Sequence, residues 1–153
     1  MNTGKKRNID IKNFLPHRPP MLMVSNLVSI SKTTAHTNFY IDEDCIFITN
    51  KFLSETGLIE NAAQSCSAIV GQSYFEKDDV EGKSNNIIGY ISAIKKVTLY
   101  GLPKVGDTIV TKASLISRVD TGSVTMCSIA STTFNINKII VDCTLNFLIH
   151  EVK

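Results

Sequence analysis

The sequence predicts an α+β fold with one long helix and an antiparallel sheet that is free to wrap it. Apolar residues recur at helical spacing, without proline, over residues 54–75. After residue 86, four runs with the alternation and β-branched content of strands follow one another, separated by short turns. A helix between early strands and a run of later strands is an α+β pattern. The 153 residues contain no linker or repeat, so we expect a single domain over residues 1–153.

The elements expected before the helix are short. A helical turn is expected over residues 10–14, with Asp10 as its capping residue and Pro16 ending it. Strands are expected over residues 21–30 and 33–41, because both segments are apolar or rich in β-branched and aromatic residues. An acidic break over residues 42–44 then separates the second strand from a short apolar run over residues 45–49.

The helix and the later strands are bounded by turn and cap residues. Ser54 or Thr56 is expected to cap the helix, and an acidic, glycine-containing loop is expected over residues 76–86. The later strands are expected over residues 87–100, 108–118, 123–133 and 138–150. The segments between them contain proline, glycine, aspartate and asparagine, which suit tight turns.

Composition excludes several classes of protein. The net charge of +2 is too small to predict a nucleic-acid-binding surface. No apolar run approaches the roughly 18 residues that cross a bilayer, so no membrane span is expected. The four cysteines form no CxxC pair, so neither a zinc site nor a disulfide framework is predicted, and we expect reduced cysteines in a cytoplasmic protein without a cofactor.

Three sequence landmarks resemble the β-hydroxyacyl-acyl carrier protein dehydratases. They are LPHRPP at residues 15–20, GLIENAAQ at residues 57–64, and PKVGD at residues 103–107. The landmarks occur in the family's order and at about its spacing, so the resemblance covers nearly the whole chain. It implies the hot-dog fold, in which a curved antiparallel sheet wraps one long helix. It also implies a homodimer with two active sites at its interface.

The same resemblance implies an activity and a carrier. The family dehydrates a (3R)-hydroxyacyl thioester of acyl carrier protein to the trans-2-enoyl thioester, in fatty acid or related lipid and polyene biosynthesis. Acyl carrier proteins are acidic, and we expect Lys95, Lys96 and Lys104 to form the docking surface.

Glu60 and Gln64 stand where the family's helix carries a glutamate four residues before a glutamine. Burial in the apolar helix would raise the pKa of Glu60 and the helix dipole would lower it, so the residue suits proton transfer. Its alternative role is a capping or exposed carboxylate, and Gln64 could equally be a satisfied buried amide. Gly57 and Leu58 are the expected N–H donors to the thioester carbonyl oxygen.

The chain departs from the family at the GHFP segment that normally precedes the helix. The matching residues are 50–53, where Lys51 stands in place of the family's histidine and Phe52 follows it beside the expected substrate. Lys51 could donate a proton if burial lowered its pKa, but a surface lysine is the favoured interpretation. His17 is a tempting substitute, although a packed structural histidine is favoured there, and Cys66 is expected in the core.

Two other functions remain open because the expected histidine is missing. The chain could be a catalytically silent acyl-binding subunit that pairs with an active partner. It could also be a hot-dog thioesterase, in which Glu60 activates water or attacks the thioester without a histidine. We rank the dehydratase first, the silent subunit second and the thioesterase third.

Overall fold

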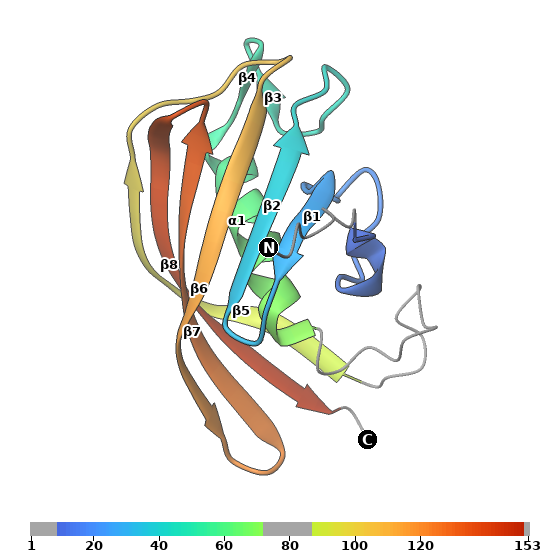
Figure 1. The fold of residues 1–153 in the computed structure, drawn as a ribbon, viewed down its shortest axis with the longest axis vertical. Coiled ribbons are helices and arrows are strands. Elements are labelled where there is room, and N and C mark those ends of the chain that lie inside the picture. The colour runs from blue at the N-terminus through green and yellow to red at the C-terminus, as the bar shows by residue number, and fades with distance from the viewer. Residues whose placement is uncertain (1–8, 72–86, 152–153) are drawn as a thin grey trace, which may run out of the picture.

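The computed structural model describes residues 9–71 and 87–151, and these form one long helix and a six-stranded antiparallel sheet (Figure 1). The strand order in the sheet is β1-β2-β6-β7-β8-β5. The strands are β1 (Asn26–Ile30), β2 (Thr34–Tyr40), β5 (Ile87–Leu99), β6 (Thr108–Asp120), β7 (Val124–Asn135) and β8 (Lys138–Glu151). A 3₁₀ turn, η1 (Ile11–Asn13), precedes them, and Asp10 caps it by accepting a hydrogen bond from the Lys12 N–H.

The helix α1 (Glu55–Gly71) lies against the concave face of this sheet, chiefly on β2, β6, β7 and β8. Side chains alternate along the strands, and the odd-numbered residues are the buried ones from 125 to 133 in β7 and from 141 to 149 in β8. Cys127, Ile129, Leu145 and Phe147 are buried there together with Ala62 of the helix. A sheet wrapped around one long helix is the hot-dog fold, so the predicted fold class is confirmed.

The start of α1 is covered by a hairpin of β3 (Ile48–Thr49) and β4 (Phe52–Leu53). Its two turn residues, Asn50 and Lys51, have φ values of 51° and 68°, as a two-residue hairpin of this hand requires. Of the two caps considered, Ser54 holds the helix start, because the Gly57 N–H points to its Oγ at 3.4 Å. The apolar run 45–49 thus contributes only its last two residues to a strand.

The first strand is shorter than the sequence predicts. It was expected over residues 21–30 but begins at Asn26. The reason lies in the helix, whose carboxamide side chains bind the preceding backbone. Gln64 Oε1 accepts from the Met23 N–H at 2.7 Å, and Asn61 Nδ2 donates to the Met23 carbonyl at 2.7 Å. The Met23 N–H and carbonyl groups already have hydrogen-bond partners, so they do not have to pair with a neighbouring strand.

The last strand in the sheet order, β5, pairs only with β8 among the described residues. Two bulges interrupt that pairing, leaving Ser92 and Lys95 without an opposite residue. The side chains of Ile91, Ile94 and Leu99 lie on the helix side of the sheet, since their partners on β8 are buried, yet they are 36%, 53% and 39% exposed. We call these three residues the β5 face.

The remaining boundaries agree with the sequence to within a few residues. Strands β6, β7 and β8 extend slightly further than predicted, and Gly106 and Gly122 occupy turns at positive φ. Residues 72–75 of the predicted helix and the predicted loop 76–86 lie outside the described residues. Within the described part, no helix is both long and apolar enough to cross a membrane.

Gly57→Ala tests how closely α1 approaches the hairpin. A Cβ at Gly57 would lie 2.6 Å from Leu53 Cδ1 and 2.8 Å from Phe47 Cβ. Since the Phe47 Cβ moves only with its backbone, we expect overpacking to outweigh the gain in helix propensity and to destabilise the fold by about 1–3 kcal/mol. Urea unfolding measures this. Gly101→Ala is the control, because nothing lies within 4 Å of its added Cβ; equal stabilities for the two variants would contradict the close approach.

Candidate active site

Glu60 and Gln64 lie one turn apart on α1, on the side that faces the segment before β1. Gln64 Nε2 donates to Glu60 Oε1 at 2.8 Å and to the Met21 carbonyl at 2.8 Å. Gln64 is fully buried, whereas the Glu60 side chain is 26% exposed. The helix thus presents one carboxyl group to solvent with its inner oxygen held by a buried amide.

The orientation of the Gln64 amide is determined by its other contacts. Its Oε1 accepts from the Met23 N–H, so its nitrogen must be the atom that faces Glu60. An N–H group can only donate, so Glu60 Oε1 is obliged to act as an acceptor. When Glu60 carries a proton, the Gln64 contact favours the form with that proton on Oε2, because a carbonyl oxygen is the better acceptor.

A buried polar chain beside Glu60 was not anticipated from the sequence. Thr111 Oγ1 on β6 donates to Asn61 Oδ1 at 2.7 Å, and Thr111 also lies 2.9 Å from Thr133 Oγ1 on β7. Because Asn61 in turn donates to the Met23 carbonyl, the chain ties two strands, the helix and the Met21–Met23 backbone together. The available signal was an asparagine in the middle of an apolar helical face, which needs partners when it is buried.

His17 is distant from Glu60 in the sequence but lies beside it in the fold. Its Nε2 lies 3.8 Å from Glu60 Oε1, and its side chain is 32% exposed. Arg18 Nη1 holds the surrounding backbone by donating to the carbonyls of Leu15 at 2.9 Å and His17 at 2.8 Å. Burial lowers the pKa of the His17 imidazole, Glu60 opposes that shift, and Arg18 adds to it. The histidine expected to be a structural part of its segment thus stands beside the predicted acid-base residue.

The other predicted site residues are spread around the start of the helix. Lys51 is exposed at the tip of the β3–β4 turn, and Phe52 beside it is 43% exposed. Gly57 and Leu58 are buried beneath the hairpin. The Leu58 N–H donates to the Ser54 carbonyl at 3.0 Å, so the helix itself uses this expected donor. Of the two, the Gly57 N–H is the one that retains a long and weak contact, to Ser54 Oγ.

Cys66 and Cys143 belong to the core rather than to the site. Both are buried, and burial raises the pKa of the Cys66 thiol and raises that of Cys143 to about 11. Thiols in this state are poor nucleophiles, because the thiolate is the reactive form. Over residues 9–71 and 87–151, no group of three or more histidine, cysteine, aspartate or glutamate side chains is arranged to hold a metal ion.

Comparison with solved structures places this fold among known proteins. The dehydratase heterocomplex ApeI:P from Xenorhabdus doucetiae matches with a TM-score of 0.75 at 16% identity, over 96% of this chain and 93% of that chain. The sigma28-regulated virulence protein Cj0977 from Campylobacter jejuni matches with a TM-score of 0.65 at 11% identity, over 92% of this chain and 84% of that chain.

A third similar structure is a hypothetical thioesterase with coenzyme A from Streptococcus pneumoniae TIGR4. It matches with a TM-score of 0.61 at 8% identity, over 83% of this chain and 90% of that chain. At these identities the likeness establishes the fold alone. Comparison with curated proteins finds no significant match. The sequence model of a family described as ApeP-like, ApeP dehydratase, matches residues 9–148. Because that match spans most of its 153 residues, the chain belongs to the ApeP-like dehydratase family.

Proposed function

We propose that this hot-dog dehydratase acts on a (3R)-hydroxyacyl thioester of acyl carrier protein, with Glu60 as an acid-base residue. The supporting observation is the state of the Glu60 carboxyl group. One oxygen is held by Gln64, which itself accepts from the Met23 N–H, while the Glu60 side chain remains 26% exposed near the start of the helix. A carboxyl group with a fixed orientation and an accessible second oxygen is suited to proton transfer.

The reaction requires two proton movements. The C2–H bond breaks as the C2–C3 double bond forms, and the C3–O bond breaks as the hydroxyl group is protonated and leaves as water. Glu60 Oε2 delivers the proton to the leaving hydroxyl group, and the C2 proton passes to a basic group beside it. The Gly57 N–H serves as a donor to the thioester carbonyl oxygen, where negative charge develops as the C2 proton leaves.

Glu60→Gln tests this role while preserving shape. The amide oxygen at position 60 can still accept from Gln64, so stability should change little, but the titrating group is lost. We expect hydration of a trans-2-enoyl thioester to fall by about two to four orders of magnitude. Glu55→Gln is the matched control, since Glu55 is an exposed residue in the first turn of the same helix.

The outcomes of this assay separate the three functions. Undiminished hydration by Glu60→Gln would remove the assigned role. Wild-type protein that hydrolyses acyl thioesters but does not hydrate enoyl thioesters would be a thioesterase. A chain that is inert in both assays alone, and whose complex with an active hot-dog subunit keeps full activity in the Glu60→Gln variant, would be the silent acyl-binding subunit.

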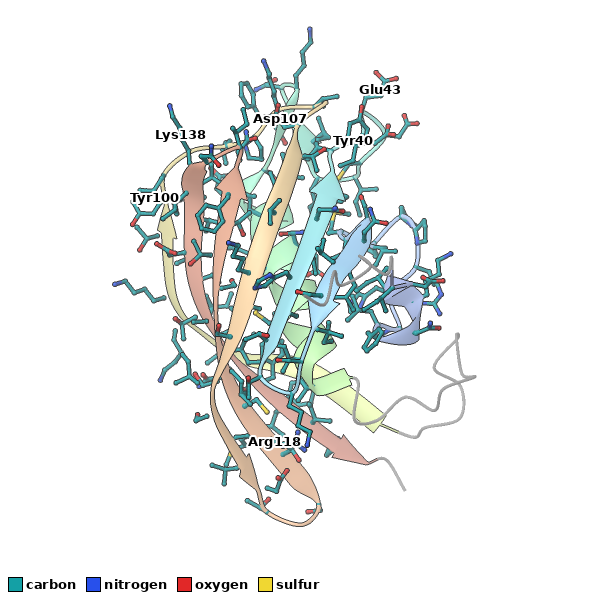
Figure 2. The ribbon with its side chains drawn as sticks, in the orientation of Figure 1. Tyr40, Glu43, Tyr100, Asp107, Arg118 and Lys138 are labelled. Carbon is teal, nitrogen blue, oxygen red and sulfur yellow. The ribbon has the colours of Figure 1, made fainter. Side chains whose placement is uncertain are left out.

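The docking site of the acyl carrier protein lies at the end of the sheet where the β3–β4 hairpin covers α1. The exposed residues Lys51 and Lys104 are neighbours there, because the Val105 N–H donates to the Lys51 carbonyl at 2.9 Å and Phe52 forms a bridge with Lys104. Figure 2 shows Asp107, whose carboxylate accepts from the Lys104 N–H, at this end of the sheet. Lys95 and Lys96, also considered from the sequence, lie further along β5.

Charge reversal at both positions tests the carrier site. Lys51→Glu combined with Lys104→Glu should weaken binding of an acidic acyl carrier protein and flatten the dependence of its affinity on salt, since two attractive charges are lost. Titration at two salt concentrations measures both effects. Lys32→Glu, at the exposed β1–β2 turn, should behave like the wild type. Equal affinities for the double variant and this control would exclude the site.

Assembly with a second hot-dog chain uses the β5 edge. One backbone edge of the strand is unpaired within residues 9–71 and 87–151, and the β5 face carries three exposed apolar side chains that α1 does not cover. Covering by another element is one of the ways in which proteins protect such an edge. The similar structure from Xenorhabdus doucetiae is a heterocomplex, so the second subunit in this proposal is either another copy of the chain or a related hot-dog subunit.

Ile94→Lys tests the assembly. A charge in the middle of the β5 face should dissociate the assembly, because it cannot be buried without a partner. Light scattering at micromolar concentration should then give the 16.9 kDa monomer. Ile136→Lys, at the 86% exposed β7–β8 turn, should leave the mass unchanged. A wild-type chain that stays monomeric, even when a related hot-dog subunit is added, would rule out the β5 edge as an interface.

A further inference from the structure

We infer that His17 takes the role left vacant at Lys51, acting as the catalytic base that removes the C2 proton while Glu60 protonates the leaving hydroxyl group. This inference rests on the proposed dehydratase function and adds the second proton-transfer residue to it. It assigns that residue to the segment before β1 rather than to the hairpin, where the family's histidine was expected and where Lys51 stands exposed.

The distance between the two side chains is the first support. His17 Nε2 and Glu60 Oε1 are 3.8 Å apart, which is too long for a direct hydrogen bond. A substrate oxygen or a water molecule placed between them can reach both atoms at about 2.8 Å. Both side chains are also about a third exposed or less, at 32% and 26%, so the pair is sheltered and yet reachable.

The rigidity of the segment that carries His17 is the second support. On one side, Arg18 Nη1 binds the carbonyls of Leu15 and His17. On the other side, the backbone of Met21 and Met23 is bound by Gln64 and Asn61 from the helix. Gln64 therefore holds both Glu60 and the backbone that follows His17, so one buried amide sets the relative position of the two groups.

The surroundings of the imidazole favour a base that returns its proton. His17 Nδ1 is buried and has no hydrogen-bond partner among the described residues, whereas Nε2 faces Glu60. For Nε2 to accept a proton, Nδ1 must carry the ring proton, and the described residues offer that N–H group no acceptor. Burial and Arg18 lower the pKa of His17, and Glu60 raises it, so neutral imidazole is the resting form near neutral pH.

His17 and Glu60 together can account for both proton transfers of the reaction. Neutral His17 takes the C2 proton at Nε2 as the C2–C3 double bond forms. Protonated Glu60 gives its Oε2 proton to the hydroxyl group, which leaves C3 as water. Proton transfer from the resulting imidazolium back to the Glu60 carboxylate restores the starting state, through a water molecule that bridges the 3.8 Å between Nε2 and Oε1. No further reactant is required.

His17→Gln tests the assignment by the same enoyl-thioester hydration assay. We expect the turnover number to fall by about two to four orders of magnitude, with little change in the thermal midpoint. His36→Gln is the matched control, because His36 lies on β2 between residues that face the helix and points to the opposite side of the sheet. The double variant with Glu60→Gln should be no slower than either single variant, since the two groups act as a unit.

A titration of the histidines by NMR provides a second readout that does not require turnover. Removing the Glu60 carboxylate should lower the pKa of His17 further, because that carboxylate is the interaction that raises it. Unchanged titration of His17 in Glu60→Gln would overturn the pairing. Wild-type turnover by His17→Gln, with Glu60→Gln inactive, would overturn the role of His17 and leave the dehydratase function standing. Failure of the wild-type protein to hydrate enoyl thioesters, alone or assembled, would remove both.

Discussion

The site depends on two helix carboxamides that bind the backbone ahead of β1. Asn61 and Gln64 satisfy the Met21 and Met23 backbone groups, which would otherwise have to pair with a strand or with water. Because these contacts are buried, losing either partner would leave a polar group unsatisfied, at a cost of about 1–3 kcal/mol. The segment therefore has one stable position on the helix. The orientation of Glu60 depends on that position, since the Gln64 amide binds both the Glu60 carboxyl group and the backbone of the segment.

The sheet and the helix could be predicted because their signals are repetitive. The strands β6, β7 and β8 each run for a dozen or more residues, and the helix keeps its apolar spacing over several turns, so no single residue decides the outcome. The start of β1 was predicted wrongly because it depends on a few specific contacts rather than on a repeated pattern. Residues 21–25 have strand-like composition, but hydrogen bonds from Asn61 and Gln64 compete with sheet pairing there. These long-range contacts cannot be inferred from composition.

The candidate site was predictable only where its residues share the helix. Glu60 and Gln64 are four residues apart, so helical geometry alone brings them together. His17 and Asn61 gave no comparable signal, because their partners lie on other elements and their proximity exists only after folding. The Leu58 N–H is a prediction from helix position that the structure does not support, because this group is not free. Its place near the helix start suggested a free donor, yet with Ser54 as the cap it falls one position too late and bonds within the helix.

The bulges of β5 affect the tendency of an unassembled chain to aggregate through its strand edge. A strand edge with evenly spaced N–H and C=O groups is a template for any passing strand, and growth from such an edge produces aggregates. Ser92 and Lys95 interrupt that spacing, and Lys95 adds a positive charge that every other copy also carries. An unassembled chain is thereby discouraged from polymerising along its own edge, and a subunit that docked on β5 as proposed would have to match an interrupted edge rather than a regular one.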